Sequence, residues 1–232
     1  MNKEQYIHLS QLFLYPKEGY KEKVRECMSY LEKNYPDAAI SFQRFYNFME
    51  GKELHEIEEI FGITFHIQAI CYLDIGYVLF GEDYSRGEFL VNMKREQAKI
   101  NHDCGEELAD NLPHVLQLMS ESDDAEFVEE LTARAILPAV EKMLEEFKAS
   151  RMESKQKFIK KKQKAVILEN VVDGNIYQSA IQTLVKVLKK DVEGIKYDDP
   201  DHAFAVSTKG FEDAACGTCS FTDNKSIKTV RT

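Results

Sequence analysis

The run His66-Ile-Gln-Ala-Ile-Cys-Tyr-Leu-Asp-Ile-Gly-Tyr-Val-Leu-Phe80 decides how this chain is interpreted, because no other stretch is so continuously apolar. Its apolar residues surround nearly the whole circumference of a helix, and it is longer than an ordinary strand, so it predicts a buried core helix. Gly76 lowers helix propensity by about 1 kcal/mol relative to alanine, which favours a close crossing of another helix there. Gly81 is placed to cap the C-terminal end.

The residues after this run predict two more helices. Ser85 and Glu88 have the spacing of a capping box, which predicts a helix from this turn to about Asn101. Cys104-Gly105 ends that helix in the prediction. Asp110-Asn111, directly before Leu112-Pro113, predicts the start of the next one.

Helical spacing recurs through most of the remaining chain. Apolar residues separated by three or four positions predict helices over 3–14, 20–31, 36–49, 127–147 and 174–190, one or two acidic turns over 53–60, and a kink at Pro138. No segment of any length alternates with a period of two. The sequence therefore predicts an all-α domain over residues 1–193, with a basic helix or hinge at 151–164 and a polar, disordered tail at 194–232.

The charge is unevenly distributed. Residues 1–150 carry 15 Lys/Arg against 29 Asp/Glu, whereas residues 151–232 carry 15 against 11. An acidic body repels nucleic acid and anionic lipid and attracts a basic partner, although acidic helix faces also serve solubility alone. The basic run 151–164 has one aromatic residue, Phe158, so it is interpreted as a solvated helix or hinge rather than a nucleic-acid site.

Three features of the sequence indicate the cellular compartment of the protein. The N-terminal residues lack the apolar region of a secretory signal, and the most apolar run is well short of the roughly 20 residues that span a bilayer. The five cysteines are odd in number and scattered, which favours a reducing compartment. We therefore expect a cytoplasmic protein without membrane insertion.

The sequence lacks the usual catalytic patterns. It contains no phosphate-binding glycine loop, no Glu-x-x-His pair at any of the six histidines, and no calcium loop. His55-Glu-Ile-Glu-Glu59 lacks the second histidine of a zinc-protease helix. We expect neither enzymatic activity nor a resident cofactor.

Two features keep alternatives open. Asp74, within the apolar run, is interpreted as a paired structural group, with a perturbed acid as the alternative. Cys216-Gly-Thr-Cys219 has the spacing of two zinc ligands out of four, and the other two would have to come from Cys104, His202 or another subunit. Incidental cysteines are favoured there over a metal site or redox exchange.

Several short motifs, in order, resemble a known family. They are Leu14-Tyr15-Pro16, Gly81-Glu82 and Arg86-Gly87, then Glu107-Leu-Ala-Asp-Asn-Leu-Pro113, and finally Phe211-Glu-Asp-Ala-Ala-Cys216-Gly217. Together they resemble the assembly chaperones of molybdenum-cofactor oxidoreductases, of the nitrate-reductase delta-subunit (NarJ) type within the TorD-like group. The resemblance covers about residues 5–150. The chain departs from it at Tyr84, where a second arginine is usual, and at Ala109 and Asn111, where proline and histidine are usual.

The resemblance implies an all-helical cytoplasmic chaperone without catalytic residues. Such a protein binds the N-terminal region of the apo catalytic subunit of a molybdopterin oxidoreductase until the molybdenum cofactor, and often an iron–sulfur cluster, is inserted. Proteins that deliver the molybdenum cofactor are further expected partners. The acidic body is consistent with a basic, partly helical client peptide.

A client contact of this kind needs an apolar groove with an acidic rim. Six residues are the predicted client-binding set: Tyr77, Phe80, Glu82, Arg86, Leu112 and Pro113. The alternatives are a helical scaffold protein without chaperone activity and, less favoured, a metal- or redox-active protein that uses Cys216 and Cys219.

Overall fold

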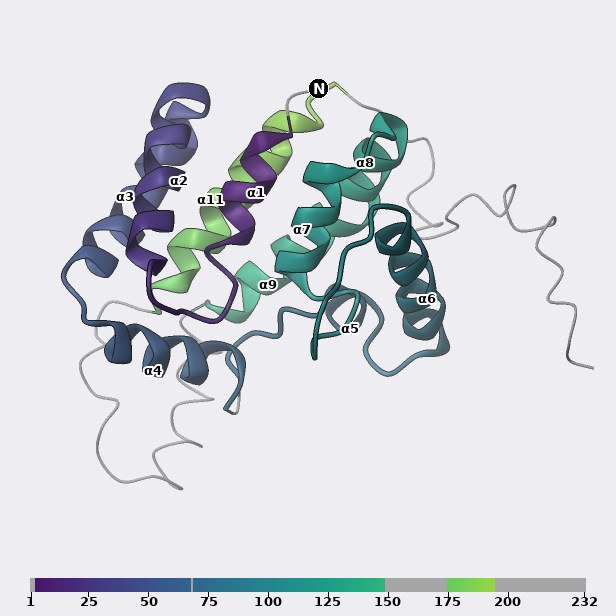
Figure 1. Ribbon diagram of the computed structural model, residues 1–232, viewed down its shortest axis with the longest axis horizontal. Coiled ribbons are helices and arrows are strands. Elements are labelled where there is room, and N and C mark those ends of the chain that lie inside the picture. Colours follow the sequence, from purple (N-terminus) through teal and green to yellow (C-terminus); the bar gives the residue numbers. More distant parts are fainter. Residues whose placement is uncertain (1–2, 68, 149–174, 195–232) are drawn as a thin grey trace, which may run out of the picture. The chain divides into compact units, whose positions relative to one another are not determined.

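The computed structural model describes residues 3–67, 69–148 and 175–194, and within them it contains helices and no β-strand (Figure 1). The predicted all-α fold is confirmed. The described residues belong to one compact unit, Met1–Asp198. The basic run 151–164, the tail beyond Gly194 and both Cys216 and Cys219 lie outside the described residues.

The first half of the unit is a group of helices around one buried tyrosine. α1 (Glu4–Ser10), α2 (Tyr20–Asn34) and α3 (Pro36–Glu50) pack in sequence, and α11 (Tyr177–Asp191) returns to lie against α3. Tyr177 is fully buried, and its ring makes edge contacts with Phe45 at 5.2 Å, Phe61 at 5.7 Å and Phe65 at 4.8 Å. Such aromatic pairs each contribute about 0.5–1.5 kcal/mol beyond burial, so this residue joins α11 to α3 and α4.

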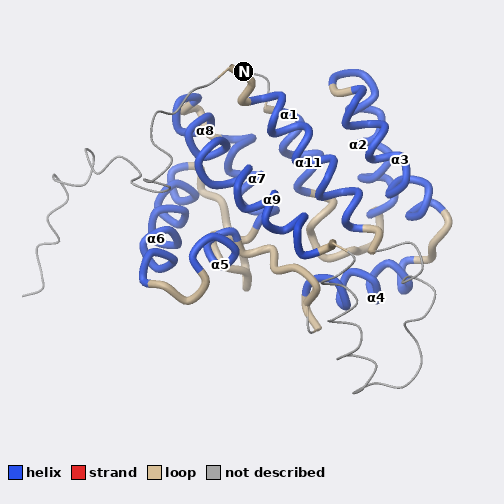
Figure 2. The backbone as a smooth tube through the Cα atoms, turned by 180° about the vertical axis from the view of Figure 1, so that it is seen from behind, coloured by secondary structure: helices blue, strands red, loops and turns tan. Residues whose placement is uncertain are grey.

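α4 (Leu54–Phe65) runs crosswise to this group in both views (Figures 1 and 2). Its first turn has a reciprocal capping box between Glu53 and Glu56, in which the Glu56 side chain accepts from the Glu53 amide at 2.9 Å. The acidic turns predicted over 53–60 are thus the start of a longer helix.

The second half consists of α5 (Ile75–Phe80), α6 (Tyr84–Lys99), α7 (Leu112–Glu121), α8 (Ala125–Leu131) and α9 (Leu137–Glu146). α7 packs on α1, and α9 packs on α11, so the two halves share one core. A π-helical turn, Thr132–Ile136, lies directly before Pro138 at the predicted kink. Proline lacks the amide hydrogen and crowds the carbonyl four residues earlier, which favours a local change of helix geometry there.

The prediction of one helix over 66–80 is wrong. α4 ends at Phe65, and only Ile75–Phe80 is helical. The backbone between α4 and α5 forms hydrogen bonds with a distant segment, the entrance of α7. The Leu73 carbonyl accepts from the Leu112 backbone amide at 2.9 Å, and the Ile75 backbone amide donates to the Asp110 carbonyl at 2.9 Å. Tertiary contacts bury Ala69, Ile70, Cys71 and Leu73, whereas Ile67 and Tyr72 are exposed. The continuous hydrophobicity of this loop resembles that of a core helix, which explains the wrong prediction.

The capping box predicted at Ser85 and Glu88 is also wrong. Asp83 caps α6, and its carboxylate accepts from the Ser85 amide at 2.9 Å and from the Ser85 hydroxyl at 2.7 Å. Aspartate is among the strongest N-cap residues, so α6 begins at Tyr84. Gly81 ends α5 with a positive φ of 64°, as predicted.

Candidate functional site

A cavity of about 170 Å³ lies where four segments meet. Its walls come from the turn after α1, the end of α4, the loop before α5, and the loop that leads into α7. In that order the main lining residues are Phe13–Tyr15; Phe61, Phe65 and His66; Tyr72–Asp74; and Glu107, Asn111, Pro113 and His114.

The cavity is surrounded by exposed apolar side chains. Tyr15 and Tyr72, which line it, are 50% and 47% exposed. Ile67 and Leu108 are exposed as well and follow the lining residues His66 and Glu107 in sequence. Exposed apolar surface beside a concavity, with the carboxylates of Asp74 and Glu107 in its wall, is typical of a site that binds another molecule.

A short antiparallel bridge joins Asp74 and Asn111, which both line the cavity. The side-chain amide of Asn111 also donates to the Asp74 carboxylate at 3.2 Å. The bridge fixes the loop before α5 against the entrance of α7, although the two are far apart in sequence.

A charged cluster lies behind the bridge. The Arg86 guanidinium is 3.8 Å from the Asp74 carboxylate and lies over the Tyr77 ring, 5.2 Å from its centroid. The fully buried Asp110 carboxylate accepts from the Gly76 amide at 3.0 Å. Burial, and secondly the negative charge of Asp74, raise the pKa of Asp110 to about 6, while Arg86 opposes this shift.

Gly76 is required where these groups meet. A Cβ at this position would lie 2.8 Å from an Asp110 carboxylate oxygen and 2.9 Å from the Phe89 ring. The prediction was a close crossing of another helix; the neighbours found are Phe89 and Arg86 of α6 and Asp110, which lies in the loop before α7. Asp74 is held by Arg86 and Asn111, which agrees with the predicted paired structural group.

The predicted client-binding residues are divided between three environments. Pro113 lines the cavity, and Tyr77 and Arg86 lie beside its Asp74 wall. Leu112 is fully buried and offers no surface.

Phe80 and Glu82 do not line the cavity either, so Pro113 is the one residue of the predicted set that does. Phe80 packs on Phe89 with ring centroids 6.1 Å apart, and Glu82 is exposed in the turn between α5 and α6. Only part of the predicted set is therefore brought together at one site.

Sequence reasoning missed Tyr15 and Tyr72 as site residues. In the sequence prediction Tyr15 belongs only to the motif Leu14-Tyr15-Pro16, directly after the helix over 3–14, and Tyr72 lies inside the buried helix over 66–80. The motif around Tyr15 is a sequence signal that could have identified Tyr15 as a site residue. Tyr72 could be identified only once the conformation of its loop was known.

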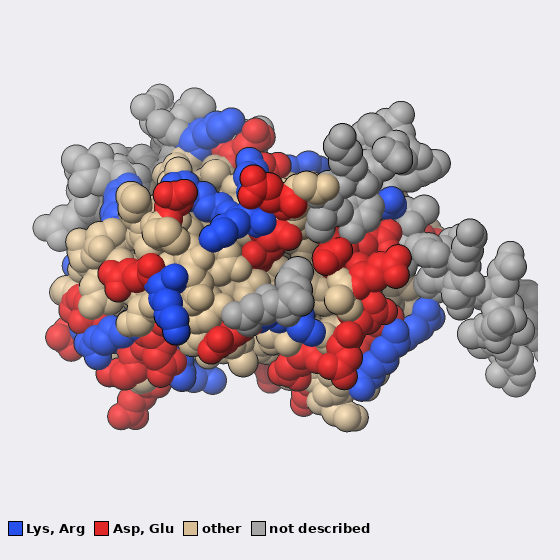
Figure 3. Space-filling model, turned by 90° about the horizontal axis from the view of Figure 1, so that it is seen from above, with Lys and Arg blue, Asp and Glu red and all other residues tan. Residues whose placement is uncertain are grey.

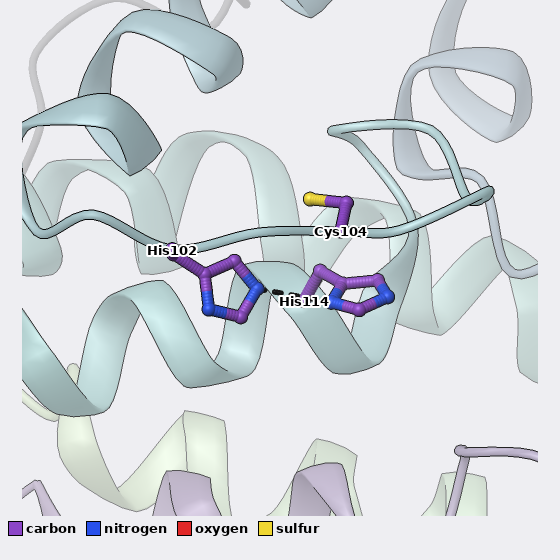
Figure 4. A group of neighbouring side chains, drawn as sticks. All are labelled: His102, Cys104 and His114. Atoms are coloured by element: carbon purple, nitrogen blue, oxygen red, sulfur yellow. Dashed lines mark hydrogen bonds between the residues drawn. The ribbon is translucent and has the colours of Figure 1, made fainter.

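A second group of side chains lies next to the cavity. His102 and Cys104, on the loop between α6 and α7, approach His114 in the first turn of α7 (Figure 4). Burial lowers the pKa of His114, with His102 the second cause, so this imidazole is neutral at neutral pH. Burial and the neighbouring Asp103 carboxylate raise the pKa of the Cys104 thiol.

The surface does not present one uniform charge on the face seen from above. There, acidic and basic side chains are interspersed around uncharged surface (Figure 3).

No helix among the described residues combines the length and the apolar character needed to cross a bilayer. Comparison with protein-family models gives no match, and comparison with curated proteins gives no relative.

Proposed function

We propose that the protein is a cytoplasmic assembly chaperone for a molybdopterin oxidoreductase of the nitrate-reductase type. It binds the N-terminal region of the apo catalytic subunit and releases it after insertion of the molybdenum cofactor, which cofactor-delivery proteins supply. It performs no catalysis itself. One observation carries the proposal: two separate motifs on which the family resemblance rests converge on the same cavity, the first through Leu14 and Tyr15, the second through Glu107, Asn111 and Pro113.

The cavity fits peptide side chains better than a cofactor. At about 170 Å³ it is smaller than the roughly 300–1,000 Å³ of typical small-molecule pockets, so one or two apolar side chains would fill it. Tyr15 and Tyr72 flank the opening and offer aromatic surface to an amphipathic helix. Glu107, an exposed carboxylate of the cavity wall, would pair with a basic residue of the client.

The test uses the catalytic subunit of a molybdopterin oxidoreductase encoded beside this protein. Its N-terminal peptide is titrated into the full-length chain by calorimetry, and co-purification of the apo subunit is measured in parallel. Tyr15→Ala and Tyr72→Ala should each weaken binding by roughly tenfold or more, because truncating an interface anchor costs on the order of 2 kcal/mol. Ile40→Ala, at a residue of α3 that is 74% exposed and remote from the lining residues, is the matched control and should leave affinity unchanged.

A pair of charge reversals separates this site from the one predicted by sequence alone. Glu107→Lys changes a carboxylate of the cavity wall, and Glu82→Lys changes one outside it. We expect Glu107→Lys to weaken binding several-fold at low salt and less at high salt, with little effect of Glu82→Lys. Binding that is insensitive to Tyr15, Tyr72 and Glu107 alike would reject the site, and failure of the apo subunit to bind at all would reject the function.

A further inference from the structure

His102, Cys104 and His114 place two nitrogen ligands and one sulfur ligand within 4.8 Å of one another. They are the one such group of three metal-ligating side chains within the described residues. The Nε2 atom of His102 lies 3.0 Å from the Nδ1 atom of His114 in a hydrogen bond (Figure 4). His102 and Cys104 are half-buried and His114 is 9% exposed, so an ion can enter from solvent.

The buried Gln97 at the end of α6 shapes the loop that carries two of these groups. Its backbone carbonyl accepts from the His102 amide at 3.0 Å, and its side-chain amide donates to the Ala109 carbonyl at 2.9 Å. The Cys104 thiol donates to its side-chain oxygen at 3.3 Å. Gln97 thus fixes the loop on both sides of Cys104, through its backbone carbonyl before the cysteine and through its side chain after it. Outer partners hold metal ligands in the same way.

The distances are close to those of a tetrahedral zinc centre. Zn–N bonds of about 2.0–2.1 Å and a Zn–S bond of about 2.3 Å require nitrogens about 3.3 Å apart and a sulfur about 3.6 Å from each. The two imidazole nitrogens already lie near that separation. The sulfur has to move by on the order of 1 Å, which rotation about the Cα–Cβ bond of a half-buried cysteine allows.

We propose that His102 Nε2, Cys104 Sγ and His114 Nδ1 bind Zn²⁺, with the fourth position open to water or an external ligand. Imidazole and thiolate are ligands that zinc prefers, whereas calcium and magnesium prefer oxygen. On binding, Cys104 releases its thiol proton to solvent. The proton shared by the two imidazoles moves to the outer nitrogen of its own ring, so both rings stay neutral and one proton is released per ion.

The proposed ion would link the loop after α6 to the first turn of α7. Because His114 also lines the cavity, the ion would lie at one edge of it. The site goes beyond the proposed chaperone function, since it requires only these three side chains and no client.

The experiment uses Co²⁺ as a spectroscopic probe and Zn²⁺ as its competitor, with the full-length chain carrying Cys216→Ser and Cys219→Ser. These changes remove Cys216 and Cys219, the one closely spaced cysteine pair of the sequence, as competing ligands. We expect one equivalent of Co²⁺, with the intense visible absorption of a tetrahedral ion and a thiolate-to-cobalt charge-transfer band, and full displacement by Zn²⁺. Cys104→Ser should abolish the charge-transfer band, and His102→Ala should weaken binding roughly tenfold or more.

His55→Ala, which removes an exposed histidine of α4 that lies outside both the group and the cavity lining, is the matched control and should leave the spectrum unchanged. Circular dichroism establishes that each variant is folded. Absence of Co²⁺ and Zn²⁺ uptake by the folded protein would overturn the proposal and leave the imidazole pair a structural hydrogen bond. Uptake that persists unchanged in both Cys104→Ser and His102→Ala would overturn it equally.

Discussion

Replacing Asp110 by asparagine should stabilise this protein in a pH-dependent manner. Asp110 is fully buried, and one of its carboxylate oxygens has no hydrogen-bond partner within the described residues. Burial and then the charge of Asp74 raise its pKa from 3.8 to about 6. The ionised carboxylate is therefore less stable in the folded protein than in the unfolded chain.

The sign and size of the effect follow from proton linkage. Below the unfolded pKa of 3.8 both states bind the proton, and the native-state preference for the neutral acid is fully retained. As the pH rises through the folded pKa of about 6, that contribution is lost, and above it the difference is constant. The shift corresponds to about 3 kcal/mol at about pH 7.5 and about 1 kcal/mol at about pH 4.5.

Asparagine cannot ionise, so the stability difference between variant and wild type should change by about 2 kcal/mol in the variant's favour between these two pH values. This change with pH is independent of any alteration in hydrogen bonding, which affects both pH values equally. Urea unfolding monitored by circular dichroism at each pH measures it. Asp123→Asn, at an exposed aspartate between α7 and α8, should show no such change. Parallel pH profiles for wild type and Asp110→Asn would refute the reasoning.

Three further substitutions test the packing by thermal unfolding. Gly76→Ala should destabilise by about 1–2 kcal/mol, because overpacking against Asp110 and Phe89 outweighs the gain of about 1 kcal/mol in helix propensity. Gly87→Ala, where a Cβ meets nothing within 4 Å, should instead stabilise α6 by about 1 kcal/mol; destabilisation there would contradict the comparison. Asn175→Ala should cost about 2–3 kcal/mol, because it removes two buried hydrogen bonds at the start of α11; a loss below about 0.5 kcal/mol would contradict this.

Much of the helical architecture could be predicted from spacing. Phe42, Phe45 and Met49 follow the period of one helix face, and all three are buried in α3. Asn111 and Pro113 have the residue types of a helix start, and α7 begins between them. These features can be predicted from local sequence, because a helix forms its backbone hydrogen bonds within its own segment.

The candidate site was only partly predictable. Pro113 and Arg86 were named because their motifs could be read in sequence, and both lie at or beside the cavity. Tyr72 was hidden by the wrong assignment of residues 66–74. The approach of His114 to the loop that carries His102 and Cys104 depends on how that loop folds back on α7, and their spacing matches no common metal motif.

Local sequence patterns were sufficient to predict that this protein is helical and where most of its helices lie. That residues 66–67 and 69–74 form a loop, with Ile67 and Tyr72 exposed, depends on contacts between distant segments. An apolar run shows the same hydrophobicity whether its amides bond within a helix or to a distant segment, and here Leu73 and Ile75 bond to the entrance of α7. That pairing brings the turn after α1, the end of α4 and the entrance of α7 around one cavity, and with it the site.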